Sequence, residues 1–156
     1  MLKKLANILK QNSLKIAVAE SCTAGNLAAK LTSISGSSQY FDRGYITYSN
    51  QAKKDMLGIL DKTLSKYGAV SEEIALEMLI GVKKNVSVDI AISITGIAGP
   101  TGGSINKPVG TVCFGFSTSA NIYTTTKFFK GSRQDIISQS VDYCIAEVYK
   151  NFNSNV

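Results

Sequence analysis

Apolar residues recur at helical spacing along several stretches of the chain. In residues 2–10 they occupy positions 2, 5, 8 and 9, so they line one face of a helix. Asn50 and Ser71 can each cap a helix N-terminus, and Ser132 with Asp135 approximates a capping box. The pattern predicts helices over residues 2–10, 25–31, 50–57, 60–67, 71–84 and 132–152.

Other stretches are short, apolar and rich in β-branched residues, which predicts strands over residues 15–19, 44–49, 88–95, 110–117 and 122–129. The last two are joined by a turn at 119–121, and so short a connection implies an antiparallel pair. Helices separate the first three strands, and a loop separates the third from the fourth. We therefore predict an α/β fold, a three-layer α/β/α sandwich with a mixed, mostly parallel sheet, in a single domain over residues 1–156.

Histidine is absent from all 156 residues. This excludes a Ser-His-Asp triad, a Cys-His dyad and every histidine-dependent zinc site within one chain. The three cysteines, Cys22, Cys113 and Cys144, are scattered without CxxC spacing, so we expect reduced thiols and no metal or other cofactor. A general base acting near neutral pH must then be a carboxylate, a lysine, a tyrosine or a cysteine.

The charge is basic, with 17 lysines and arginines against 11 acidic residues and a net charge of +6. Arg43 and Arg133 are the only arginines, and the lysines are spread along the chain, so we expect a solvated surface rather than a nucleic-acid site. No apolar run approaches the roughly 18 residues of a membrane helix, and no signal peptide pattern opens the chain. We therefore expect a cytoplasmic protein with no membrane contact.

Three polar clusters each follow a predicted strand directly, at residues 20–25, 47–53 and 96–104. In open α/β sheets, ligands bind outside the carboxyl ends of the strands. If these strands are parallel neighbours, the three clusters converge on one cleft.

Ser21 lies at the predicted strand-to-helix turn, with its hydroxyl exposed and the free N–H groups of the following helix pointing into the cleft. Such donors suit a developing oxyanion or an anionic ligand. The alternative is that Ser21 or Thr23 caps the helix. Cys22 is a rival nucleophile, although a small buried apolar role is favoured for it.

Lys53 is the candidate base. Moving a lysine pKa from about 10.4 to about 7.5 costs roughly 4 kcal/mol, which the positive end of a helix dipole and partial burial can both supply. A solvated lysine is the alternative. Tyr48 is suited to relaying a proton or orienting a substrate, with core packing as its alternative role.

The cluster at 96–104 is rich in glycine, which lets backbone amides approach a ligand closely, although it matches neither a P-loop nor a dinucleotide fingerprint. Its glycines are Gly96, Gly99, Gly102 and Gly103. Arg133, at a predicted helix start, suits a phosphate or carboxylate. The alternative is a surface ion pair with Asp135 or Asp89.

These motifs, in this order, resemble the CinA carboxy-terminal domain family over nearly the whole chain. The motifs are residues 19–25 (AESCTAG), 43–50 (RGYITYSN) with Ala52 and Lys53, 68–71 (GAVS), 95–100 (TGIAGP) with Gly102 and Gly103, and 107–112 (KPVGTV). The family contains nicotinamide-nucleotide amidases, which hydrolyse nicotinamide mononucleotide (NMN) to nicotinate mononucleotide and ammonia. The resemblance implies an α/β/α fold with a mixed sheet, a serine nucleophile at Ser21, a lysine at Lys53 and Tyr48 nearby. It also implies the stand-alone form of the domain.

We therefore predict an amidohydrolase that uses a Ser21–Lys53 dyad with Tyr48 and needs no metal. The predicted substrate-binding residues are Thr23, Gly25, Gly96, Gly99, Gly102, Gly103 and Arg133. We expect a nucleotide substrate and a homodimer or other homo-oligomer. Two alternatives stay open: a catalytically silent nucleotide-binding module and a nucleic-acid accessory protein.

Overall fold

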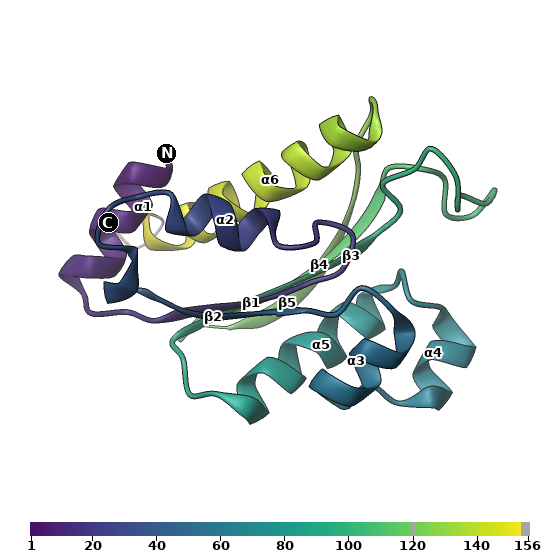
Figure 1. Cartoon of the computed structure of the whole chain (residues 1–156), viewed down its shortest axis with the longest axis horizontal. Coiled ribbons are helices and arrows are strands. Elements are labelled where there is room, and N and C mark those ends of the chain that lie inside the picture. The colour runs from purple at the N-terminus through teal and green to yellow at the C-terminus, as the bar shows by residue number, and fades with distance from the viewer. Residues whose placement is uncertain (120, 154–156) are drawn as a thin grey trace.

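The computed structural model describes residues 1–119 and 121–153 and has a central sheet between two layers of helices (Figure 1). The helices are α1 (Leu2–Gln11), α2 (Asn26–Thr32), α3 (Asn50–Leu57), α4 (Asp61–Tyr67), α5 (Glu72–Asn85) and α6 (Arg133–Asn153), with a short 3-10 turn at Ser37–Gln39. The strands are β1 (Ile16–Glu20), β2 (Phe41–Ile46), β3 (Ile90–Gly96), β4 (Thr111–Ser117) and β5 (Ile122–Phe128).

The sheet has the strand order β2-β1-β3-β4-β5. Strand β1 pairs in parallel with both β2 and β3, whereas β4 runs antiparallel to β3 and to β5. Four strands therefore point one way and β4 points the other. Helices α1, α2 and α6 cover one face, and α3, α4 and α5 cover the other (Figure 1). The predicted α/β/α sandwich with a mixed, mostly parallel sheet is confirmed.

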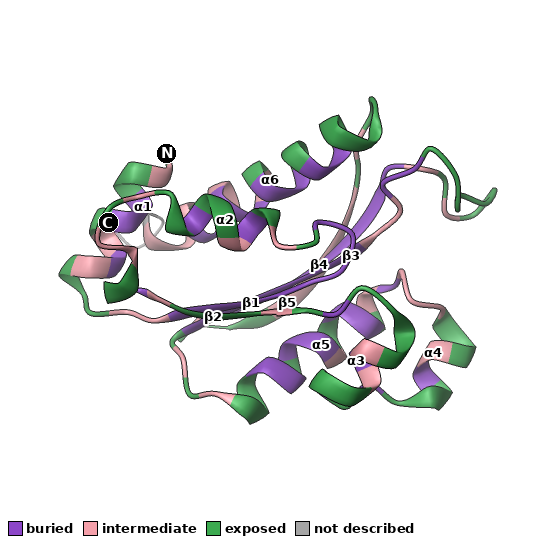
Figure 2. Ribbon diagram, in the orientation of Figure 1, coloured by how far each residue is buried: buried purple, intermediate pink, exposed green. Residues whose placement is uncertain are grey.

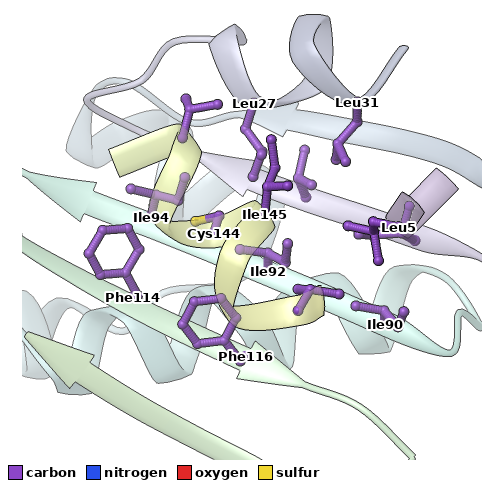
Figure 3. Close-up of a cluster of buried hydrophobic side chains, with 14 of the residues drawn as sticks. Leu5, Leu27, Leu31, Ile90, Ile92, Ile94, Phe114, Phe116, Cys144 and Ile145 are labelled. Carbon is purple, nitrogen blue, oxygen red and sulfur yellow. The ribbon is translucent and has the colours of Figure 1, made fainter. Parts of the chain in front are cut away.

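The two helical layers enclose two hydrophobic clusters, one on each face of the sheet. Figure 3 shows the larger cluster, to which Leu27 of α2, Phe114 of β4 and Cys144 of α6 all contribute. The smaller cluster packs Met78 and Leu79 of α5 against the other face. Strand β1 is buried at every position because helices cover both of its sides (Figure 2).

Two predicted boundaries around the polar cluster at residues 47–53 were wrong. Strand β2 covers 41–46 instead of 44–49, because it is an edge strand whose polar residues face solvent and hide its start in the sequence. Ser49, not Asn50, caps α3: its Oγ accepts a hydrogen bond from Ala52 N at 3.0 Å. The serine oxygen reaches a donor three residues ahead, which leaves Asn50 as the first helical residue.

The other predicted caps are confirmed. Ser71 Oγ accepts from Ile74 N at 3.2 Å. The Asp135 carboxylate accepts hydrogen bonds from Ser132 Oγ at 2.6 Å and from Ser132 N at 2.8 Å, and these two bonds lower the pKa of Asp135. Of the predicted 119–121 turn, Ala120 lies outside the described residues. No helix in the described part of the chain is long and apolar enough to span a membrane.

Candidate active site

The carboxyl ends of β1, β2 and β3 meet at one edge of the sheet and bring the three polar clusters together. Ser21 N donates to Ile94 O at 2.9 Å, and Thr47 N donates to Glu20 O at 2.9 Å, so the backbone ties the strand ends side by side. A cavity of about 260 Å³ opens at this edge. The convergence predicted from the order of motifs is therefore present in the fold.

Lys53 is buried beside Ser21, with 1% of its surface exposed. Its Nζ lies 2.9 Å from Ser21 Oγ, 2.9 Å from Thr47 O and 3.2 Å from Tyr48 O. The solvated alternative for Lys53 was wrong. The side chain starts from the second turn of α3 and returns to the loop that precedes this helix, where two carbonyl oxygens hold its amine.

Burial lowers the pKa of the Lys53 amine, because an ammonium loses its hydration there; the nearby Cys22 thiol acts weakly in the opposite direction. Ser21 is also buried, with 7% of its surface exposed. The pair therefore combines an alcohol and an amine that is biased toward its neutral form, at hydrogen-bond distance.

The turn between β1 and α2 differs from the prediction. Glu20 is fully buried, and its carboxylate accepts hydrogen bonds from Gly25 N, Leu27 N and Ala28 N at 2.8–3.0 Å. The N–H groups at the start of α2 were expected to point into the cleft. Instead they donate hydrogen bonds to the Glu20 carboxylate. Neither Ser21 nor Thr23 caps α2 through its side chain, so that alternative was also wrong.

Backbone geometry explains how Glu20 reaches the helix. Ala24 and Gly25 both adopt positive φ, at 46° and 95°, which folds the turn back over the end of β1. Ala24 N donates to Ser21 O at 3.1 Å and closes the turn. A glutamate five to eight residues before the donors has no standard capping spacing, so sequence patterns gave no signal for it.

Cys22 lies next to the pair but is a poor nucleophile. Burial raises the pKa of its thiol to about 12, so the thiol stays protonated near neutral pH. It packs in the larger hydrophobic cluster while also lining the cavity. The small buried apolar role that was favoured for it agrees with this environment.

Arg133 reaches the cavity from the first residue of α6. Its Nη1 donates to Gly99 O at 2.7 Å, and its Nη2 donates to Tyr48 Oη at 2.9 Å. The ion pair with Asp135 or Asp89 was wrong: Asp135 binds Ser132, and Asp89 accepts from Lys15 N. Tyr48 is 56% exposed, so core packing was wrong for it too.

The cavity lining includes most of the predicted residues. Gly96, Gly99, Gly102 and Arg133 line it together with Ser21, Tyr48 and Lys53. Three predicted substrate-binding residues lie outside the lining: Thr23, Gly25 and Gly103. Gly25 is committed to Glu20, and Gly103 packs against the backbone of Val109.

Thr23 is fully buried, and its Oγ1 has no hydrogen-bond partner within the described residues. The same holds for Thr47 Oγ1. Both residues flank the Ser21–Lys53 pair along the chain, so two unpaired hydroxyls lie in the segments that form the site.

Sequence reasoning missed part of the lining, namely Asn50, Ala69, Val70, Thr95 and Thr101. Thr95 Oγ1 donates to Ala69 O at 2.7 Å and fastens the segment before α5 to the end of β3. The motif at 68–71 was the available signal, but a Gly-Ala-Val segment carries no side-chain chemistry of its own. Across the described ranges, no group of three or more His, Cys, Asp or Glu residues is arranged to hold a metal ion.

Comparisons with known proteins agree with this architecture. The nicotinamide-nucleotide amidohydrolase PncC of Escherichia coli K12 is 43% identical over 154 residues, covering 98% of this chain and 93% of that protein. Its namesake from Enterobacter agglomerans is 44% identical over 148 residues, 94% of this chain and 90% of that protein. A CinA-like protein of Syntrophobacter fumaroxidans is 49% identical over 134 residues, 86% of this chain but 32% of that longer protein.

Solved structures are similar over nearly the whole length. The competence damage-inducible protein A (ComA) of Klebsiella pneumoniae has a TM-score of 0.93 at 33% identity, covering 97% of this chain and 94% of that one. The competence/damage inducible protein CihA of Agrobacterium tumefaciens has a TM-score of 0.91 at 36% identity, covering 96% and 92%. The sequence model of the CinA C-terminal domain family matches residues 1–152. With this match, and with full-length relatives above 40% identity, the chain belongs to the CinA C-terminal domain family.

Proposed function

We propose that this protein is an amidohydrolase that converts NMN to nicotinate mononucleotide and ammonia, with Ser21 as nucleophile and Lys53 as general base. The observation that carries the proposal is the 2.9 Å distance between Lys53 Nζ and Ser21 Oγ in a buried site. The relatives named nicotinamide-nucleotide amidohydrolase supply the substrate class. Without a histidine in the chain, a lysine of lowered pKa is one of few bases left.

The contacts of Lys53 suit a neutral amine. An uncharged –NH₂ group has two hydrogens and one lone pair. We assign the two hydrogens to the carbonyl oxygens of Thr47 and Tyr48, which leaves the lone pair to accept from the Ser21 hydroxyl. In this arrangement Ser21 donates its proton to Lys53, which is the direction that activates a nucleophile.

In the first half-reaction, Ser21 Oγ bonds to the carboxamide carbon while Lys53 takes the hydroxyl proton. The tetrahedral intermediate collapses as the C–N bond breaks, and Lys53 returns the proton to the departing nitrogen, which leaves as ammonia. In the second half-reaction, Lys53 takes a proton from water, whose oxygen attacks the acyl carbon. The C–Oγ bond then breaks, and Ser21 regains its proton from Lys53.

The oxyanion needs donors other than the start of α2, because Glu20 occupies those N–H groups. Within the described residues, Cys22 N and Thr23 N donate to no backbone carbonyl. Both residues directly follow Ser21 in the chain. We assign the oxyanion to this pair.

We assign binding of the NMN phosphate to Arg133 and the 96–104 loop. Arg133 uses two of its five N–H groups on Gly99 and Tyr48, so donors remain for an anion. Tyr48 then positions the arginine through its hydroxyl and Lys53 through its carbonyl oxygen.

The proposal is tested by ammonia release from NMN. Ser21→Ala should abolish turnover while NMN still binds, because the variant loses the nucleophile and little else. Lys54→Ala is the control. Lys54 follows Lys53 in the chain but forms an ion pair with Asp61, with 3.0 Å between Nζ and Oδ1, so its loss should leave turnover unchanged. Turnover that survives in Ser21→Ala would end the mechanism. NMN binding by the wild type without ammonia release would favour the silent nucleotide-binding module instead.

A further inference from the structure

Glu20 is a buried carboxylate beside the proposed nucleophile, and the proposed reaction does not use it. It is the last residue of β1, and none of its surface is exposed. Because side chains alternate between the two faces of a strand, Glu20 lies on the same face as Ile16 and Val18 of the larger hydrophobic cluster. Within the described residues, no lysine or arginine forms an ion pair with Glu20. A carboxylate in such surroundings must be stabilised by hydrogen bonds.

Three backbone N–H groups supply these hydrogen bonds, and they use both oxygens of the carboxylate. Glu20 Oε2 accepts from Gly25 N and from Leu27 N, each at 3.0 Å, and Oε1 accepts from Ala28 N at 2.8 Å. Gly25 is the N-cap residue of α2 and has no side chain that could accept these donors. Glu20 therefore performs the capping role from the strand that precedes the helix.

The backbone on either side of Glu20 is held by the two neighbouring strands. Glu20 O accepts from Thr47 N, and Ser21 N donates to Ile94 O, both at 2.9 Å. The main chain of Glu20 is thus fixed in the middle of three parallel strands, while its carboxylate is bonded to the start of α2. This one side chain therefore links the sheet edge directly to the helix.

The link closes around a turn that contains Ser21. Ala24 N donates to Ser21 O at 3.1 Å. Ala24 has a φ of 46°, in the left-handed region that alanine rarely adopts. Backbone of this kind persists where the surrounding structure holds it. Here the hydrogen bond from Gly25 N to Glu20 holds the residue that directly follows Ala24.

We propose that Glu20 is a positioning residue, whose carboxylate holds the turn at 21–25 in the form that keeps Ser21 Oγ within hydrogen-bond distance of Lys53 Nζ. Lys53 is held independently of this turn, by two carbonyl oxygens in the segment before α3. The distance within the pair therefore depends on where the turn places Ser21. The proposed oxyanion donors lie in the same turn. The kinetic consequence of this inference rests on the proposed function, but the geometric consequence does not.

Glu20→Gln tests the role with almost no change in side-chain size. Glutamine has one acceptor oxygen, and its –NH₂ group must face at least one of the three N–H groups, so the turn loses part of its support. We expect kcat for ammonia release from NMN to fall at least about 100-fold, the loss that a displacement of about 1 Å can cause. KM should stay within about threefold, because the contacts of Arg133 are unchanged.

Glu77→Gln is the matched control. The carboxylate of Glu77 in α5 also accepts at a helix start with both oxygens, from Leu60 N at 2.9 Å and from Thr63 Oγ1. Glu77 does not line the cavity beside Ser21. This variant loses the same kind of hydrogen bond, so its melting temperature should fall while kcat stays within about twofold of the wild type. An equal fall in kcat in both variants would show a purely structural role for Glu20 and overturn the proposal.

A crystal structure of Glu20→Gln separates this inference from the proposed reaction. We expect Ser21 Oγ to move beyond about 3.5 Å from Lys53 Nζ, outside hydrogen-bond distance. If Glu20→Gln does not fold, Glu20→Asp has a side chain one methylene shorter and should show the same displacement and the same fall in kcat. An unmoved Ser21, or a kcat equal to that of the wild type, would overturn the positioning role. A wild type that releases no ammonia would end the proposed function, while the measured distance would still decide the role of Glu20.

Discussion

Lys53 shows how one buried side chain sets the chemistry of a site. Its amine is withdrawn from water and held by two backbone carbonyl oxygens, and burial is the main cause of its lowered pKa. The neighbouring Cys22 responds to the same burial in the opposite way, with a raised pKa. Burial favours the neutral form of both groups, so the same environment makes an amine available as a base and makes a thiol unreactive.

The lowered pKa of Lys53 predicts a pH-dependent stability. Between the lowered pKa in the folded state and the ordinary lysine value of 10.5, the unfolded chain binds a proton that the folded chain has lost. The free energy of unfolding therefore gains a contribution as pH rises through this window. Lys53→Met lacks the amine and should lack this contribution.

Urea unfolding of the wild type and of Lys53→Met between pH 7 and pH 10 measures the difference. The free energy of unfolding of the wild type should rise relative to that of the variant as pH rises. A constant difference between wild type and Lys53→Met across the range would contradict the lowered pKa.

At the scale of elements, the position of α3 depends on its contact with α5. Gly81 of α5 lies against the end of α3, where an added Cβ would come 2.3 Å from Leu57 O. This approach lets two helices of the same layer pack closely beside the sheet, with Ser49 fixing the start of α3 and Gly58 its end. Lys53 lies between these two caps, so the packing of α3 on α5 holds the proposed general base in place.

Gly81→Ala should destabilise the protein although alanine favours a helix by about 1 kcal/mol over glycine. The Cβ meets backbone rather than a flexible side chain, so α3 must move, at a cost of roughly 2 kcal/mol net. Thermal unfolding measures the change, with Ser138→Ala on the exposed face of α6 as a control that should stay within about 0.5 kcal/mol of wild type. A Gly81→Ala protein as stable as wild type would show that α3 and α5 are not held this closely.

At the scale of the whole molecule, the site joins both helical layers across the sheet edge. Lys53 comes from α3 on one face, and Arg133 comes from α6 on the other. Arg133 donates hydrogen bonds to Tyr48, which follows β2, and to Gly99, which follows β3. In the proposed reaction, a substrate in the cavity would meet Ser21 and Lys53 at the sheet edge and the Arg133 guanidinium beside them.

Arg133→Ala should raise KM for NMN by roughly 10- to 100-fold, the loss expected for a charge-assisted hydrogen bond. Nicotinamide riboside, which lacks the phosphate, should show nearly the same KM with wild type and variant. Steady-state ammonia release with both compounds makes the comparison. An equal rise in KM for both would mean that Arg133 only holds Tyr48 and the loop in position.

The sequence by itself determined the order of elements, the mixed sheet, the absence of histidine chemistry, the position of Ser21 just after β1 and the position of Lys53 in the helix that follows β2. These follow from local patterns, since hydrophobic periodicity and residue identity are properties of short segments. The tertiary structure decided what depends on distant contacts. The Glu20 carboxylate accepts the N–H groups at the start of α2 because the turn at Ala24 and Gly25 folds back over β1. Arg133 meets Tyr48 across 85 residues because the start of α6 lies beside the segment that follows β2. Burial of the Lys53 amine, from which its pKa follows, likewise exists only once three strands and two helical layers have packed around it.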